Sequence, residues 1–332
     1  MNAAIEGSSR SALILREPRV ASGPVTTGGW FLHWLLCFYL SVLAGQSTQA
    51  GIMREDVPEQ EYLDFAADPL FDPVGVVWVS PNSFDEGTGL SCTATLIAPQ
   101  WVMTCGHCGL EYPSGVREIG FWLGDDLDQE VTHYQVPDAW YVHPDYWYQQ
   151  EVGIGADLAL IHLPEPITDV TPAVRFRGED TLDIVAQMAG FGRHGIINEA
   201  DTDKDWKKRA GTKVVYGFGG EYQNYLISTE PQYMHIEFDE LDSPDLQPLE
   251  WGGAPGDSGS PWFNESGEII GVTRGVLWYY VYPYPHHYGY NTIALRTSLY
   301  NDWIDSYVIP EPNAAFLAIL GASWGVLARR RF

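Results

Sequence analysis

The segment WVMTCGHCG, residues 101–109, combines two kinds of residue that could do chemistry. Cys105 and Cys108 have the C-x-x-C spacing of disulfide oxidoreductases, whereas His107 between them could act as a general base. A redox cysteine of that kind needs a helix N-terminus, where the dipole and the backbone N–H groups lower the pKa of the thiol. The residues after Cys108, GLEYPSG, do not favour a helix. The sequence therefore favours the histidine base over the redox pair.

Two distant segments hold a serine and an aspartate that suit such a base. GDSGSP, residues 256–261, flanks Ser258 with glycines, and GADLALIHL, residues 155–163, places Asp157 before an apolar strand. Together with TCGHC, they resemble the three signature segments of the chymotrypsin-like serine peptidases, in that family's order of His, Asp and Ser. This order differs between unrelated folds, so it disfavours subtilisin-like and α/β-hydrolase arrangements.

The resemblance implies a role for each of these residues. Ser258 would be the nucleophile, because a serine hydroxyl is inert at neutral pH until an adjacent base takes its proton. His107 would be that base, and Asp157 would hold its tautomer and stabilise the imidazolium. The N–H groups of Gly256 and Ser258 would form the oxyanion hole, since glycines allow the backbone to bend there.

The resemblance covers roughly residues 70–308 and includes a disulfide. CTATLIAPQWVMTCGHC resembles the strand and turn that lead to the catalytic histidine in bacterial members of the family. Cys92 and Cys108 have the family spacing for a bridge, which would leave Cys105 free and buried. A bridge between Cys105 and Cys108 is the main competitor.

The family also suggests which residues choose the substrate and receive a new N-terminus. The specificity pocket would include Gly252, Thr273, Arg274 and Gly275, with Gly252 where trypsin-like members place an aspartate. Cleavage after Lys or Arg therefore loses its main support. Arg274 could attract an acidic side chain, but we expect it to face outward into solvent.

In many animal members of the family, a new Ile or Val N-terminus pairs with the aspartate before the nucleophile, here Asp257. Ile52 resembles such a start, but no basic residue precedes it and cleavage after Ala50 would leave Gly51 first. The sequence therefore leaves open whether Asp257 receives a new N-terminus or has another partner.

An aromatic segment occupies the position of the pocket rim. LWYYVYPYPHHYGYN, residues 277–291, contains six tyrosines. They could clamp an apolar or peptide substrate, or pair across the strands of a twisted hairpin. The sequence does not decide between the two.

The elements that must position these residues are mostly short strands. Runs rich in Val, Ile, Tyr, Trp and Thr alternate with Gly, Pro, Asn and Asp, which is typical of an antiparallel sandwich or barrel. The family resemblance sharpens this to an all-β, chymotrypsin-like fold of two antiparallel six-stranded Greek-key β-barrels with a C-terminal helix. That helix is expected over residues 297–308, with Leu299, Trp303 and Ile304 on one face. The strands are expected at 74–80, 92–98, 101–106, 118–124, 158–163, 184–192, 225–230, 234–239, 260–264 and 269–275.

The two ends of the chain are expected to lie outside the fold. Residues 1–50 combine three arginines with the apolar run WFLHWLLCFYLSVLAG and read as a secretory signal peptide, cleaved after Ala50. Residues 310–332 resemble a PEP-CTERM sorting signal, with Pro-Glu-Pro, an apolar stretch and three arginines, which implies an exosortase-type processing enzyme as partner. The chain would then be exported to the cell surface or beyond and touch the membrane only through this tail. The expected domains are an N-terminal segment (51–73), a first barrel with His and Asp (74–180), a second barrel with Ser and the helix (181–309), and the two ends.

Charge excludes several functions. Without the two ends, which hold six Arg and three Glu, the chain carries 12 basic and 41 acidic residues, a net charge of -29. Such a surface repels nucleic acid and anionic lipid. All four lysines lie in KDWKKRAGTK, residues 204–213, which we expect to be an exposed loop open to proteolysis. No histidine has metal-ligand spacing, so neither a metal nor a cofactor is expected.

The sequence therefore predicts an exported serine endopeptidase that hydrolyses peptide bonds through an acyl-enzyme. A rival of another class is a catalytically silent surface binding or adhesion module on the same fold. The redox rival predicts that activity depends on Cys105 and not on Ser258.

Overall fold

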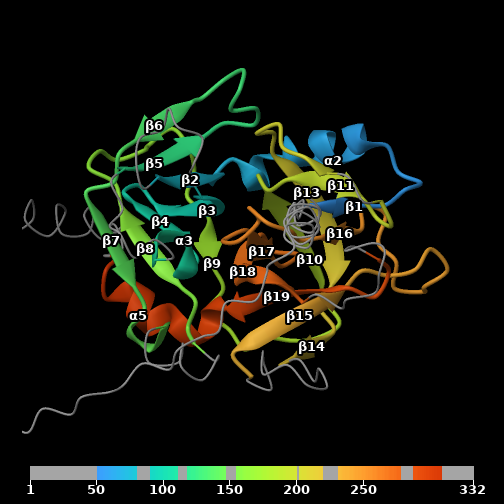
Figure 1. Ribbon diagram of the computed structural model, residues 1–332. Helices are drawn as coiled ribbons and strands as arrows, with labels where there is room; N and C mark the ends of the chain where they lie inside the picture. Colours follow the sequence, from blue (N-terminus) through green and yellow to red (C-terminus); the bar gives the residue numbers. More distant parts are fainter. Residues whose placement is uncertain are drawn as a thin grey trace, which may run out of the picture. The chain divides into compact units, whose positions relative to one another are not determined.

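Two curled antiparallel sheets make up most of the described chain (Figure 1). The computed structural model describes residues 51–80, 90–110, 118–146, 155–199, 202–219, 231–277 and 287–308. These ranges all belong to one compact unit. The predicted mostly β architecture of two antiparallel sheets is confirmed.

The first sheet has seven strands in the order β6-β5-β2-β3-β4-β8-β7. Strand β2 is an inner strand of this sheet and nearly all of it is buried, as its unbroken apolar run VGVVWVS indicates. It pairs with β3 on one side and β5 on the other. The bounds are β2 Val74–Ser80, β3 Leu90–Ala98, β4 Trp101–Thr104, β5 Glu118–Leu123, β6 His133–Gln135, β7 Ala139–Val142 and β8 Ala159–His162.

The second sheet has eight strands, seven of them in the order β13-β10-β17-β18-β19-β15-β14. The eighth, β9, pairs with β18 in parallel. Both sheets exceed the expected six strands because short edge strands extend them. The bounds are β9 Val174–Arg175, β10 Val185–Gly190, β13 Arg209–Val214, β14 Gly217–Phe218, β15 Tyr233–Glu237, β17 Pro261–Phe263, β18 Glu268–Leu277 and β19 Asn291–Arg296.

A small third sheet holds the start of the described chain. Strand β1 (Ile52–Met53) lies between β11 (His194–Ile196) and β16 (Trp251–Gly252), and β12 (Thr202–Asp203) pairs with β11. Both residues of β1 are buried. This two-residue strand is too short to leave a periodic pattern, so the sequence did not predict it.

The helices are few and short. The expected C-terminal helix forms as a 3-10 turn, η3 (Thr297–Tyr300), followed by α5 (Asn301–Asp305). Ile304 is buried, but Leu299 is 53% exposed, so the predicted apolar face is wrong at Leu299. The sequence did not predict the others, which are α2 (Glu59–Ala66), η1 (Pro69–Phe71) and the single turn α3 (His107–Leu110).

The prediction of an exposed loop at residues 204–213 is wrong. This segment leads into β13, and Lys208 and Lys213 are buried. Lys208 pairs with Asp125, and Lys213 pairs with Asp239 and Glu250. Partnered in this way, a buried ammonium group escapes most of the cost of burying a lone charge.

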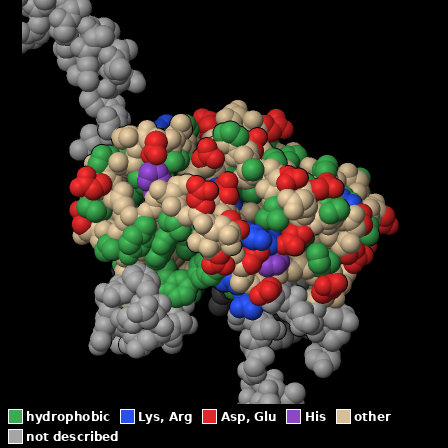
Figure 2. Space-filling view, turned by 90° about the horizontal axis from the view of Figure 1, so that it is seen from above, with side chains coloured by type: hydrophobic (Ala, Val, Ile, Leu, Met, Phe, Trp, Pro, Cys, Tyr) green, Lys and Arg blue, Asp and Glu red, His purple; other side chains and the backbone are tan. Residues whose placement is uncertain are grey.

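The surface and the two chain ends complete the comparison. Asp and Glu side chains are spread over the face seen in Figure 2, as the negative net charge predicts. No helix among the described residues is long and apolar enough to cross a membrane. The expected signal peptide, the strand expected at 225–230 and the sorting tail lie outside the described residues.

Candidate active site

Strands β4 and β8 bring His107 and Asp157 together. The strands are antiparallel neighbours, with Thr104 opposite Ala159, so the residues just beyond these positions meet at one edge of the sheet. The backbone N–H of His107 donates to Asp157 Oδ1 at 2.8 Å, and His107 Nδ1 lies 2.7 Å from Asp157 Oδ2. Two contacts thus fix the carboxylate against the imidazole.

Asp157 is held in its ionised form although it is buried. Burial alone would raise its pKa, but the charge and hydrogen bonds of His107 and the charge of Arg274 outweigh burial and lower the pKa. A fixed carboxylate at this place can orient the imidazole and stabilise its charged form.

Ser258 lies in a tight turn whose conformation depends on glycine. Gly256 has φ +99° and Gly259 has φ +88°, both in the region that L side chains rarely adopt. A Cβ on Gly259 would also come within 2.0 Å of the carbonyl oxygen of Thr93. The N–H of Thr93, on β3 of the first sheet, donates to the carbonyl oxygens of Gly256 (3.0 Å) and Ser258 (2.8 Å). These bonds tie the serine turn of the second sheet to the first.

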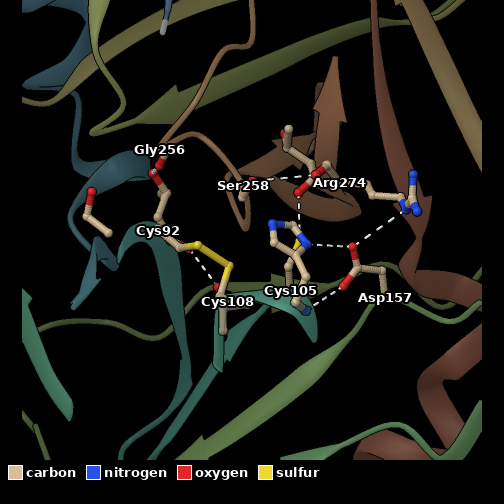
Figure 3. The surroundings of a disulfide bond; sticks show 12 residues. Cys92, Cys105, Cys108, Asp157, Gly256, Ser258 and Arg274 are labelled. Carbon is tan, nitrogen blue, oxygen red and sulfur yellow. Dashed lines mark hydrogen bonds and ion pairs between the residues drawn. A yellow bond between two sulfur atoms is a disulfide. The ribbon is translucent and has the colours of Figure 1, made fainter. Parts of the chain in front are cut away.

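Two N–H groups of this turn remain available. Within the described ranges, the N–H of Gly256 and that of Ser258 donate to no protein group, whereas those of Asp257, Gly259 and Ser260 do. The Ser258 hydroxyl lies 3.5 Å from the carbonyl oxygen of Arg274 (Figure 3). The turn can therefore offer two backbone donors beside one hydroxyl, as stabilisation of an oxyanion requires.

The disulfide joins Cys92 to Cys108, and Cys105 is free and buried. Because Cys108 is bonded to Cys92, the C-x-x-C segment is not a dithiol pair. Cys105 donates a hydrogen bond to the carbonyl oxygen of Thr273 at 2.8 Å, and burial raises the pKa of its thiol well above the usual value. Cys105 thus packs beneath the site as a neutral side chain.

The glycines of the expected specificity pocket differ in their surroundings. A Cβ on Gly252 would lie 1.5 Å from the hydroxyl of Tyr290, so this position is already filled. A Cβ on Gly275 would meet no described atom within 4 Å. Thr273 is buried, and its hydroxyl accepts a hydrogen bond from Trp262 Nε1 at 2.8 Å. Among these three positions, only Gly275 has free space around it within the described part of the chain.

Arg274 does not face outward into solvent, so that expectation is wrong. It is the extra residue of a β-bulge in β18, because Thr273 pairs with Ala294 and Gly275 with Ile293. Its Nε lies 3.6 Å from Asp157 Oδ2 (Figure 3). A β-bulge changes the direction of a side chain, which explains why Arg274 points toward Asp157. No sequence pattern predicted a bulge here.

Sequence reasoning did not identify Gly51 as a contact of Asp257. The backbone N–H of Gly51 donates to Asp257 Oδ2 at 2.9 Å, and the N–H groups of Gly192 and Ala254 also donate to this carboxylate. Burial nevertheless raises the pKa of Asp257 to about 6, although these hydrogen bonds and the charge of Lys204 oppose the shift. The only sequence feature that pointed to Gly51 was the pattern of small residues before it, which predicts cleavage after Ala50.

One group of possible metal ligands lies away from this site. Glu59, His194 and Asp205 come close together, but Arg209 pairs with both carboxylates. A guanidinium in the middle of the cluster supplies the positive charge that a cation would bring, so we assign no metal there.

A mostly β chain with paired His and Asp next to a serine turn belongs to the class of chymotrypsin-like folds. The family model described as Trypsin matches residues 76–225, so this segment is similar to the trypsin-like serine peptidases. Human "Chymotrypsin-like elastase family member 1" is 32% identical over 99 residues, which is 27% of this chain and 36% of that protein. "Brachyurin" of Leptuca pugilator is 28% identical over 130 residues, 36% of this chain and 55% of that protein. The chain thus spans about a third to a half of the length of these relatives.

Solved structures show the same fold. Mouse neuropsin, described as a serine protease, aligns with a TM-score of 0.51 and 16% identity over 76% of this chain and 97% of that chain. A structure titled HL collagenase aligns with a TM-score of 0.53 and 20% identity over 72% of this chain and 94% of that chain. At these identities the likeness concerns the fold alone.

Proposed function

We propose that this protein is a serine endopeptidase that acts on proteins or peptides outside the cytoplasm. The observation that carries the proposal is the pair of hydrogen bonds between His107 and Asp157. This pair lies next to the turn of Ser258, whose conformation depends on glycines with positive φ. The family of the matched segment supports it.

In this mechanism each residue acts on a stated atom. His107 takes the proton of the Ser258 hydroxyl as Oγ attacks the peptide carbonyl carbon, and Asp157 stabilises the imidazolium. The N–H groups of Gly256 and Ser258 donate to the oxyanion of the tetrahedral intermediate. His107 then gives its proton to the leaving amine. In the second half of the reaction, His107 takes a proton from a water molecule that attacks the ester carbonyl, and it returns this proton to Ser258 Oγ as the acyl group leaves. No cofactor takes part.

The test separates this function from a silent binding module. A fluorophosphonate probe should label the wild-type protein but not Ser258→Ala, and this variant should lose about 10⁴ to 10⁶ in kcat on a cleaved peptide. Cys105→Ala should keep most of the activity, because the serine mechanism does not use the Cys105 thiol. A redox site would lose its activity in this variant. Absence of labelling in folded, processed wild type would favour the binding module.

The same proposal includes export and a new N-terminus. The disulfide suits an oxidising compartment. Cleavage after Ala50 would convert the Gly51 amide into an α-ammonium group, 2.9 Å from the Asp257 carboxylate in the present geometry. The C-terminal segment would serve as a sorting tail processed by an exosortase-type enzyme.

Substrate specificity would depend on the surroundings of Gly252 on β16 and of Gly275 on β18. Tyr290 fills the space at Gly252, so no charge and little depth remain there for a Lys or Arg side chain. Gly275 leaves room at the rim for an apolar side chain. We therefore propose apolar side chains of small to moderate size at the cleaved position.

A further inference from the structure

The side chain of Arg274 places a full positive charge against the carboxylate of the candidate triad. Its Nε and the His107 Nδ1 share one oxygen, Asp157 Oδ2, at 3.6 Å and 2.7 Å. Figure 3 shows the Arg274 side chain extending from the strand beside Ser258 to Asp157. Arg274 thus lies near two residues of the candidate triad: its carbonyl oxygen is near the Ser258 hydroxyl, and its side chain reaches Asp157.

The bulge and an aromatic ring hold this arrangement. The guanidinium lies over the ring of Tyr233, 5.7 Å from its centroid, and the hydroxyl of Tyr233 donates to the carbonyl oxygen of Gly155. Arg274 Nε is buried and has no hydrogen-bond partner within the described part of the chain. Because the side chain is only 30% exposed, water screens its charge incompletely. The charge of Arg274 therefore acts on Asp157 at short range and helps to lower the pKa of this carboxyl group.

Arg274 is the only described group near the pair that brings a permanent charge. Besides Asp157 and His107, the titratable groups facing the pair are Cys105 and Tyr233. Burial raises the pKa of both, so the thiol and the phenol stay neutral over the working range. A cation beside the dyad favours the ionised carboxylate and disfavours the charged imidazole.

We propose that Arg274 is a positioning residue that, by sharing the Asp157 carboxylate with His107, keeps His107 in its neutral, proton-accepting form at lower pH. The proposal rests on the proposed peptidase function. It predicts that the acidic limb of the pH–rate profile depends on residue 274.

Arg274→Gln removes the charge, Arg274→Lys keeps it without the planar guanidinium, and Arg177→Gln is the matched control. Arg177 carries the same charge, is exposed and pairs with Asp305 on the surface. The first readout is the rate constant of fluorophosphonate labelling between pH 4 and pH 9. In Arg274→Gln the acidic limb should move upward by about half a pH unit or more, in Arg274→Lys by less, and in Arg177→Gln hardly at all.

A second readout does not depend on activity. In the Ser258→Ala background, NMR follows the titration of the His107 ring, whose signal is assigned by its loss in His107→Gln. The ring should titrate at a higher pH when Arg274→Gln is added. Circular dichroism checks that each variant is folded, and Arg274→Met, which also removes the charge, replaces Arg274→Gln in both readouts if the latter does not fold.

The outcomes are distinguishable. An unchanged limb and an unchanged ring titration in a folded Arg274→Gln variant would overturn the inference. A rise in KM confined to acidic peptides, with the limb unmoved, would make Arg274 a substrate contact and would also overturn it. A wild type that is not labelled at any pH would refute the peptidase function, while the ring titration would still test Arg274.

Discussion

Single residues of the candidate site are limited by the space around them as much as by their chemistry. Gly252 on β16 and Gly275 on β18 both belong to the expected pocket, yet among the described residues only Gly275 leaves room for a side chain. Neither has a positive φ, so a larger residue meets no backbone strain at either position. The difference between them is purely one of contact and can be tested as such.

Gly275→Val and Gly252→Ala should therefore have opposite effects. The first should leave the free energy of unfolding within about 1 kcal/mol of wild type and should shift cleavage toward peptides with smaller side chains. The second drives a methyl group into buried Tyr290 and should cost about 1 to 3 kcal/mol. Urea unfolding and a peptide library measure the two properties. An unchanged preference in Gly275→Val would show that this residue does not line the pocket.

At the scale of elements, charges that look solvated in the sequence are built into the second sheet. Lys213 on β13 is fully buried, 2.7 Å from Glu250 Oε1, and also pairs with Asp239. Burial raises the pKa of Glu250, although the charge of Lys213 opposes this shift. The ion cluster joins β13 to the segment that precedes β16 and Gly252.

Lys213→Met should destabilise the protein far more than Lys207→Met. Removing Lys213 leaves two carboxylates without their cation, which typically costs about 3 to 5 kcal/mol. Lys207 is 41% exposed and lies 3.8 Å from Asp205, so its loss should cost less than about 1 kcal/mol. Urea unfolding at pH 7 compares the two. Equal losses would mean that the buried cluster contributes nothing special to stability.

The sequence predicted the elements whose pattern is local and missed those that depend on distant partners. Strand β2 begins and ends where its apolar run does, and the disulfide and the free Cys105 lie where the family spacing implied. Strand β13 was missed because its one lysine, Lys213, pairs with acidic residues far along the chain. The position of Arg274 depends on a register shift between β18 and β19, and that of Gly51 on insertion between two strands. Both features depend on contacts between residues far apart in the sequence, so neither composition nor local spacing predicts them.

At the scale of the whole molecule, the start of the fold reaches into its interior. Strand β1 follows the expected cleavage point directly and pairs with β16, so Gly51 stands next to Asp257. In the uncut chain this residue offers only an amide N–H, and burial keeps the pKa of Asp257 at about 6. A free α-amino group there would offer a full charge. Export would then complete the site by creating the partner of a buried carboxylate.

The stability of the processed and unprocessed chains should differ in a pH-dependent way. In the unprocessed chain the folded pKa of Asp257 is raised above its unfolded value near 3.9, so stability is lost as pH rises from about 4 to 6. In the processed chain the ammonium offsets this loss until the amino group, with an ordinary pKa near 8 that the carboxylate raises further, is deprotonated. The processed chain should be more stable between about pH 6 and 8, and the advantage should vanish below pH 4 and at high pH.

Urea unfolding of the full chain bearing an uncleavable Ala50→Pro junction, set against the processed protein, measures this difference. Asp257→Asn is the control, because without the carboxylate the two forms should lose their pH-dependent difference. A stability gap that is constant from pH 4 to pH 9, or that persists unchanged in Asp257→Asn, would mean that the new amino group does not pair with Asp257. The coupling of export to the assembly of the serine turn would then have to be abandoned, while the triad geometry would stand on its own contacts.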